Sequence, residues 1–71
     1  MSQNEKVLRH LRTYGSITTM DAFMMYGITR LSARISDLRA QGVQITSQTE
    51  KARNRDGRLV YFDRYVLGVK E

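Results

Sequence analysis

The chain has 71 residues, of which 41% are hydrophobic, so its length allows one compact domain and no second core. It contains no cysteine and a single histidine, which excludes a disulfide framework and the common cysteine and histidine zinc sites. Twelve basic residues against seven acidic ones give a net charge of +5, so the expected partner is a polyanion, with generic solubility charge as the alternative.

The sequence also lacks the marks of a membrane or secreted protein. No apolar run approaches the roughly 18 residues that a membrane span needs. The first ten residues, MSQNEKVLRH, have no apolar segment of the kind found in signal peptides. We therefore expect a cytoplasmic protein without a membrane partner, and the absence of cysteine suits a reducing compartment.

The first helix is predicted over residues 3–14. Ser2 and Glu5 have the spacing of a capping box, in which each side chain accepts a hydrogen bond from the other residue's backbone N–H. Gly15 is expected to end the helix, because glycine readily adopts the left-handed conformation of a helix terminus. One face is apolar and is expected to be buried: Val7, Leu8, Leu11 and Tyr14.

A short second helix over residues 19–26 repeats the capping pattern. Thr18 is the predicted N-cap, Asp21 lies three residues later, and Ile17 is placed to pack against the helix. A short strand near Ile17 is also expected, and Gly27 is expected to end the helix. The residues of this helix that are expected to be buried are Ala22, Phe23 and Tyr26.

The third helix is predicted over residues 30–41, with Thr29 as its N-cap and Gly42 at its end. Apolar spacing predicts which side chains face the core: Ile28, Leu31, Ile35 and Leu38. The opposite face then carries short side chains: Thr29, Ala33, Ser36 and Ala40. Three polar residues flank this outer face: Arg30, Ser32 and Asp37.

This outer face is unusual for a solvated helix, which more often carries Glu and Lys. Short side chains let a helix axis approach base edges inside a DNA major groove about 12 Å wide, and hydroxyl groups can bond bases or phosphates. A solvated helix without a ligand is the alternative interpretation. A short helix, a tight turn and a third helix in this order also form the arrangement of a helix-turn-helix.

After the third helix the apolar period changes to two, which predicts a hairpin. The strands are predicted over residues 43–48 and 59–67, and the tip over residues 49–58 around the turn signal Asp56-Gly57. The second strand carries apolar residues on both phases of its alternation. A bulge near residues 63 and 64 would reconcile the two phases.

The predicted hairpin tip is strongly basic. Its cations lie around Asn54, and Ala52 is its only apolar residue: Lys51, Arg53, Arg55 and Arg58. Residues 30–58 hold seven cations and three anions, a net charge of +4, so most of the excess charge lies in one segment. Such a loop suits phosphates or a minor groove, and a mobile charged loop without a ligand is the alternative.

These motifs resemble the winged helix-turn-helix family, and more narrowly the small stand-alone winged-helix proteins of bacteriophages and prophages. The matching segments are Gly15-Ser-Ile-Thr18, Gly27-Ile-Thr-Arg-Leu-Ser-Ala-Arg-Ile35, Asp37-Leu-Arg39, Gly42, Asn54-Arg-Asp-Gly57 and Arg64-Tyr-Val-Leu67. The resemblance implies one α+β domain over residues 1–71. Its third helix would be the recognition helix in the major groove of double-stranded DNA, and its hairpin, the wing, would contact the flanking backbone or minor groove.

Residue by residue, the resemblance implies DNA contacts from the start of the third helix and from the next turn. The predicted DNA-binding residues of this helix are Thr29, Arg30, Ser32, Ala33, Arg34, Ser36 and Asp37. Those of the wing are Lys51, Arg53, Asn54, Arg55 and Arg58. The implied role is a phage-type transcriptional regulator or an excisionase-like architectural factor at the nucleoid of a bacterial host. Since one small domain reads few base pairs, a homodimer or a cooperative oligomer on DNA is expected.

The second helix departs from such proteins, which commonly place charged residues where this chain has Met24 and Met25. If Met24 is exposed together with Met20, the two could form an apolar patch for self-association or for a host protein. A protein-interaction module is therefore the alternative function, and an exposed methionine without a role is the simpler interpretation. Binding of RNA by the same basic surface is a third alternative, in which a narrow A-form major groove would exclude the third helix.

No enzymatic chemistry is predicted. His10 lies at the edge of the apolar face of the first helix, where a structural role is expected. The carboxylates suit helix caps, a turn and solvent pairs, among them a pair between Arg34 and Asp37. The five glycines are scattered and form no phosphate-binding loop, so no catalytic residue, metal or cofactor is expected.

Overall fold

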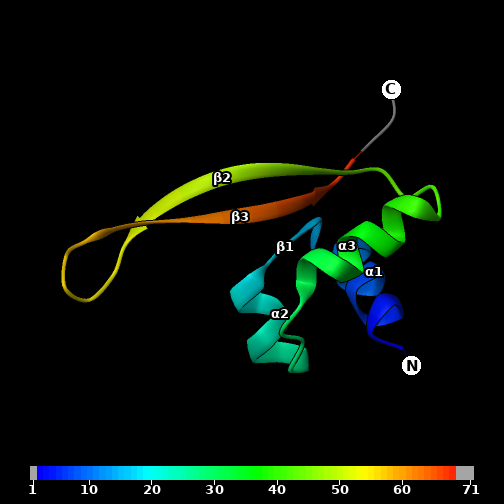
Figure 1. Ribbon diagram of the computed structural model, residues 1–71, viewed down its shortest axis with the longest axis horizontal. Coiled ribbons are helices and arrows are strands. Elements are labelled where there is room, and N and C mark those ends of the chain that lie inside the picture. The colour runs from blue at the N-terminus through cyan, green and yellow to red at the C-terminus, as the bar shows by residue number, and fades with distance from the viewer. Residues whose placement is uncertain (1, 69–71) are drawn as a thin grey trace.

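A computed structural model describes residues 2–68 and shows three helices, a short strand and a long β-hairpin (Figure 1). In chain order the elements are α1 (Gln3–Tyr14), β1 (Ser16–Thr18), α2 (Thr19–Tyr26), α3 (Leu31–Ala40), β2 (Ile45–Arg53) and β3 (Leu59–Leu67). The strands form one antiparallel sheet in the order β1-β3-β2, so the fold is α+β, as expected. None of the helices in the described range is long and apolar enough to cross a membrane.

Helix α1 begins and ends where its capping residues predict. The Glu5 backbone N–H donates to Ser2 Oγ at 3.1 Å, and the Ser2 N–H donates to Glu5 Oε1 at 2.8 Å. Gly15 ends the helix with a φ of 86°, in the left-handed region that favours glycine. Both hydrogen bonds of the predicted capping box are therefore present.

The charge of this cap makes part of the stability depend on pH. The hydrogen bond from the Ser2 backbone N–H lowers the pKa of Glu5 below its ordinary value of 4.5. Because the folded-state pKa is the lower one, the carboxylate stabilises the fold fully above the unfolded pKa and loses this contribution as pH falls through the folded pKa.

We therefore expect Glu5→Gln to flatten the loss of stability in acid. Glutamine can keep the cap hydrogen bond but does not titrate. Urea unfolding at a series of pH values from roughly 3 to 7 measures this, and the parent chain should lose more stability toward acid than the variant. Parallel pH profiles for the two proteins would contradict the assignment.

His10 has the structural role that its position predicts. It is buried, and its Nδ1 lies 2.7 Å from Tyr26 Oη, which joins α1 to the end of α2. Tyr14 was expected in the core, but 65% of it is exposed. The last turn of α1 reaches past the core, and the Tyr14 ring lies against His10 with the ring centroids 4.5 Å apart.

Helix α2 has the predicted cap but buries less than expected. The Asp21 N–H donates to Thr18 Oγ1 and the Thr18 N–H donates to Asp21 Oδ2, both at 3.1 Å. Of the three residues expected in the core, Ala22 is fully buried, Tyr26 is half-buried and Phe23 is 54% exposed. The prediction for Phe23 was wrong because this short helix covers only one end of the core.

Helix α3 begins one residue later than predicted, and Thr29 is not its N-cap. Arg30 holds the cap position, with no hydrogen bond from its side chain to the helix. The Arg30 carbonyl instead accepts from the backbone N–H groups of Ala33 and Arg34, at 3.1 and 3.4 Å. Thr29 stands one residue before the cap position, and its hydroxyl makes no hydrogen bond to the first turn of α3.

The hairpin is longer and more regular than expected. Strands β2 and β3 pair continuously from Ile45↔Leu67 to Arg53↔Leu59, so the predicted bulge near residues 63 and 64 is absent. Strand β2 covers residues 45–53 rather than 43–48, and the tip is confined to residues 54–58 instead of 49–58. Both faces of the outer hairpin are exposed, so the positions of its apolar residues do not show which face of the strand would pack on the core.

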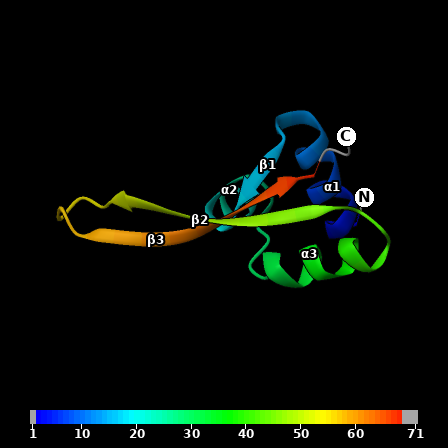
Figure 2. The same ribbon diagram turned by 90° about the horizontal axis from the view of Figure 1, so that it is seen from above.

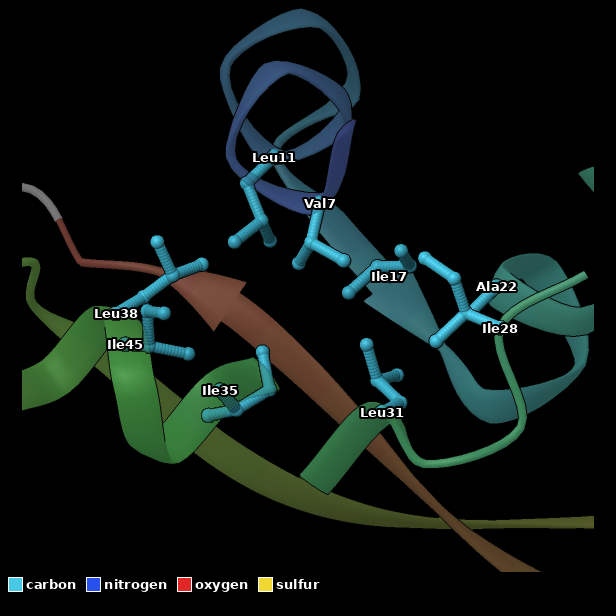
Figure 3. Close-up of a cluster of buried hydrophobic side chains, with 9 residues drawn as sticks. All are labelled: Val7, Leu11, Ile17, Ala22, Ile28, Leu31, Ile35, Leu38 and Ile45. Atoms are coloured by element: carbon cyan, nitrogen blue, oxygen red, sulfur yellow. The ribbon is translucent and has the colours of Figure 1, made fainter. Parts of the chain in front are cut away.

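The core lies between α1, α3 and the base of the sheet. Its buried side chains come from α1, β1, α2, α3, β2 and the turn before α3, and they point toward one another (Figure 3). The buried set is Val7, Leu11, Ile17, Ala22, Ile28, Leu31, Ile35, Leu38 and Ile45. Strand β1, expected near Ile17, pairs with residues 64–66 of β3 and thereby ties the helices to the sheet.

Candidate nucleic-acid interface

Helix α3 turns its short side chains away from the core. Leu31, Ile35 and Leu38 are buried, whereas Ser32 and Ser36 are exposed. Ala33 is half-buried, and Ala40 is exposed at the end of the helix. Figure 2 shows α3 along one flank of the molecule, with the hairpin extending past its N-terminal end. The face without bulky side chains is therefore open to solvent.

Two predicted site residues lie in the turn that precedes α3. Thr29 and Arg30 are both exposed. Within residues 2–68, the Arg30 guanidinium has neither a hydrogen bond nor an ion pair. An exposed guanidinium at the start of a helix can bond a guanine edge in two places or a phosphate.

Arg34 and Asp37 form the predicted pair, and Arg34 also reaches α1. Arg34 Nη2 lies 3.2 Å from Asp37 Oδ2, and Arg34 Nη1 donates to Gln3 Oε1 at 3.2 Å. Its Nε atom is buried without a partner among the described residues. Arg34 therefore braces α3 against α1, while Asp37 is half-buried and partly neutralised by it.

Arg39 fixes the start of β2 against α3. Its Nε and Nη2 donate to the Ile45 carbonyl at 3.0 and 2.8 Å, and Nη2 also donates to Ser47 Oγ at 3.1 Å. The sequence showed Arg39 only as one more cation, because nothing in a local pattern points to a carbonyl six residues on. This contact fixes the position of the hairpin relative to the helix.

The outer hairpin is a two-stranded ribbon that stands away from the helices (Figure 1). All residues from 51 to 61 are exposed. Strand β2, with nine residues, has a length of about 27 Å. Alternation along the strands places Lys51 and Arg53 on one face and Ala52, Val60 and Phe62 on the other. Lys51 and Arg53 thus belong to a paired strand and not to the loop.

Asn54 organises the hairpin tip. Its Oδ1 accepts from the backbone N–H groups of Asp56 and Arg58, both at 3.0 Å. Arg53 Nη1 donates to the Gly57 carbonyl at 2.8 Å, and Gly57 has a φ of 78°. Asn54 and Arg53 therefore hold the turn that carries the other two arginines.

Arg55 and Arg58 are the exposed cations of the tip. Neither guanidinium has a side-chain partner in the described part of the chain, and both residues are exposed. Arg64 at the base of the hairpin differs, because its Nε lies 3.0 Å from Glu50 Oε2 and its Nη1 donates to Ser16 Oγ at 3.1 Å. Within the hairpin, the arginines available to a ligand therefore lie at the tip and not at the base.

Helix α2 carries an apolar surface that the sequence anticipated in part. Met24 is 72% exposed, and Met20 and Met25 are also exposed. Phe23, which was expected to be buried, belongs to this surface too. Beside it, a groove of about 640 Å³ runs between α2 and β3, and its apolar lining comes from four residues: Met20, Phe23, Val60 and Phe62.

The described residues offer no metal-binding cluster. Between residues 2 and 68, no three His, Cys, Asp or Glu side chains come together in a way that could hold an ion. Asp21 and Glu5 are engaged in helix caps, and Asp37 and Glu50 are engaged with arginines. What this surface can do chemically is bind an anion and present hydroxyl and guanidinium donors.

Comparison with known proteins places this geometry in a family. No curated protein and no solved structure showed significant similarity to the chain. The sequence does match the family described as winged helix-turn-helix domain, and the match runs from residue 2 to residue 70. It includes all three helices and the whole β2–β3 hairpin. The chain therefore belongs to the family of winged helix-turn-helix domains.

Proposed function

We propose that the chain binds specific sites on double-stranded DNA, as a phage-type transcriptional regulator or as an excisionase-like architectural factor. Domains of this family are typically non-catalytic and bind DNA, so the family predicts the class of ligand. The observation that carries the proposal is the exposed short-residue face of α3 beside a protruding cationic wing.

Sequence recognition is assigned to α3. Ser32 and Ser36 present hydroxyl groups on the outer face, and Ala33 between them is short enough for close approach to base edges. Arg30 and Thr29 stand at the N-terminal end, where Arg30 can bond one guanine in two places. Such a pair contributes about 1–3 kcal/mol of discrimination against the wrong base.

Sequence-independent affinity is assigned to the wing. Arg55 and Arg58 at the tip and Lys51 on β2 supply charge for phosphates or a minor groove. Arg53 and Asn54, which were also predicted to contact DNA, act mainly by shaping the tip, since their polar groups are engaged there.

Arg34 and Asp37 have an indirect role in this proposal. Arg34 is held by Gln3 and by Asp37, so we assign it to the placement of α3 rather than to a base. The pairing also reduces the repulsion that an unpaired Asp37 would exert on phosphates near the helix.

We expect Ser36→Ala to change base preference more than overall affinity. The variant removes a hydroxyl from the outer face of α3 and leaves every cation in place. Selection of bound sequences from a random duplex library, run in parallel with the parent chain, measures the effect. The preference should relax at one or two adjacent positions, with a change of about 1–3 kcal/mol at each. An unchanged selected sequence would remove Ser36 from the interface.

The same selection tests the proposed function itself. An enriched site with two-fold symmetry would support a dimer on DNA, and tandem repeats would support cooperative loading. If the parent chain enriches no sequence and binds duplexes with an affinity independent of salt, the proposal fails.

A further inference from the structure

The two faces of the outer hairpin differ in composition. Strands β2 and β3 pair without interruption, and directly opposite residues of an antiparallel pair project to the same face. One face therefore carries two cations and two apolar or aromatic side chains, and we call it the cationic face of the wing: Lys51, Arg53, Leu59 and Tyr61. Val60 and Phe62 project to the other face, where they line the groove beside α2. The two faces are therefore suited to different contacts.

The cationic face continues the face of the sheet that packs on the core. At the base of the hairpin this face carries Ile45, which is buried, and Tyr65 and Leu67, which pack against the core. Two residues beyond Ile45, Ser47 Oγ accepts a hydrogen bond from Arg39 of α3 at 3.1 Å. The same face of the sheet therefore contacts α3 at its base and carries the cations of the wing beyond it.

Tyr61 is the most prominent side chain of the cationic face. It is 66% exposed, whereas Leu59 is 45% exposed. Within residues 2–68, its hydroxyl has no hydrogen bond and its ring has no aromatic partner. Lys51, directly opposite, has neither an ion pair nor a side-chain hydrogen bond in the same range. Neither side chain is engaged in holding the fold, so both are available to a ligand.

Asp63 marks the inner limit of this surface. It lies opposite Thr49 on the same face of the sheet, and its Oδ1 accepts from Thr49 Oγ1 at 3.3 Å. A carboxylate at this position repels a phosphate. From Tyr61 toward the tip, the charged residues of this face are the cations Lys51 and Arg53. An anionic ligand is therefore expected from the Lys51–Tyr61 pair outward.

We propose that the cationic face is the side of the wing that meets double-stranded DNA, and that Tyr61 contacts the sugar-phosphate backbone there. The inference rests on the proposed function and adds to it the orientation of the wing and one contact residue. Directly opposite residues have Cβ atoms about 5 Å apart, so the Lys51 amine can pair with one phosphate while the Tyr61 ring packs on the neighbouring deoxyribose. Tyrosine is among the side chains that commonly bond DNA phosphates. The groove beside α2 then stays outside the interface.

Fluorescence anisotropy with a labelled duplex tests the contact through affinity. Tyr61→Ala should weaken binding at least about fivefold, because an aromatic ring at an interface buries a large area. It should leave the slope of log affinity against log salt unchanged, since no charge is removed, whereas Lys51→Ala should lower this slope by about 1. Val60→Ala is the matched control, because it shortens an exposed side chain of the same strand on the groove face, and it should bind like the parent chain.

A tryptophan reporter gives a second readout that does not depend on affinity. The chain contains no tryptophan, so Tyr61→Trp introduces a single fluorescent probe. Saturating duplex should protect this probe from quenching by acrylamide. Tyr14→Trp is the matched control, because Tyr14 on α1 is 65% exposed and lies outside the wing, and duplex should not change its quenching.

The outcomes separate this inference from the proposed function. If the parent chain binds no duplex, the proposed function fails and this inference fails with it. If the parent chain binds duplexes but Tyr61→Ala binds as tightly as Val60→Ala, only this inference fails. Equal protection of the two tryptophan variants would also overturn this inference alone. Stronger protection of Tyr61→Trp by a single strand than by the duplex would overturn it too, because it would indicate stacking on unpaired bases.

Discussion

Replacing Ile35 by alanine is expected to lower the free energy of unfolding by about 2–5 kcal/mol. Ile35 lies in the middle of α3, is only 1% exposed and points into the cluster of buried side chains (Figure 3). The substitution removes buried carbon atoms and leaves a cavity that the surrounding helices fill only in part. A domain this small has little stability to lose, so a measurable fraction of the variant should be unfolded at 25 °C.

Urea unfolding followed by circular dichroism measures the difference. Ser36→Ala is the matched control, because it shortens the next side chain along the same helix on the exposed face. Its free energy of unfolding should stay within about 0.5 kcal/mol of the parent value. Equal losses for the two variants would mean that the inward and outward faces of α3 are assigned incorrectly.

Removing both exposed arginines of the wing tip is expected to reduce the salt dependence of DNA binding. If Arg55 and Arg58 each neutralise one phosphate, the double alanine variant should lose about 2 units from the slope of log affinity against log salt. Affinity should fall for every duplex by a similar factor, because phosphate contacts carry no sequence information.

Fluorescence anisotropy with a labelled duplex, titrated at about 50 to 200 mM salt, measures this slope. The matched control is the double variant Arg9→Ala and Arg12→Ala, which removes the same charge from the exposed side of α1. The control should change the slope less than the tip variant does. Equal changes would show that only net charge matters, and an unchanged slope in the tip variant would exclude the tip from the interface.

The helix ends were predictable because their determinants are local. Ser2 with Glu5 and Thr18 with Asp21 form capping boxes within four residues, and the sequence alone specifies them. The inward face of α3 was predictable for a similar reason, since a period of 3.6 residues separates one buried side from one exposed side. The prediction for Thr29 was wrong because the helix begins after Arg30, whose side chain makes no capping bond, so no residue type at that position marks the start.

The hairpin was harder to predict because its outer part has no buried face. Val60 is exposed and Phe62 only half-buried, so apolar alternation there does not report which side faces the core. The contacts that fix the hairpin join residues that no local pattern relates, such as Arg39 with the Ile45 carbonyl and Arg64 with Ser16. Phe23 was wrongly predicted to be buried for a similar reason, because its exposure depends on how much of the core is covered by α2.

The structure divides the predicted site residues into exposed residues and residues that are engaged within the protein. Ser36 and Ala40 on the outer face of α3 and the two tip arginines are exposed, as helical spacing and turn chemistry indicate, whereas Ala33 is half-buried. Arg34 is engaged with Gln3, a residue 31 positions earlier, and only the packing of α1 on α3 brings the two together. Sequence therefore indicated which side of the helix is open, but not which cations are engaged within the protein.

The hydrogen bonds made by Asn54 bear on the entropy cost of binding a polyanion. Its side-chain oxygen holds two backbone N–H groups, so the loop is already shaped before a ligand arrives. A preformed loop loses less conformational entropy on complex formation than a disordered basic tail would. The backbone that carries Arg55 and Arg58 is thus already ordered, and only their side chains remain to be fixed when they meet a polyanion.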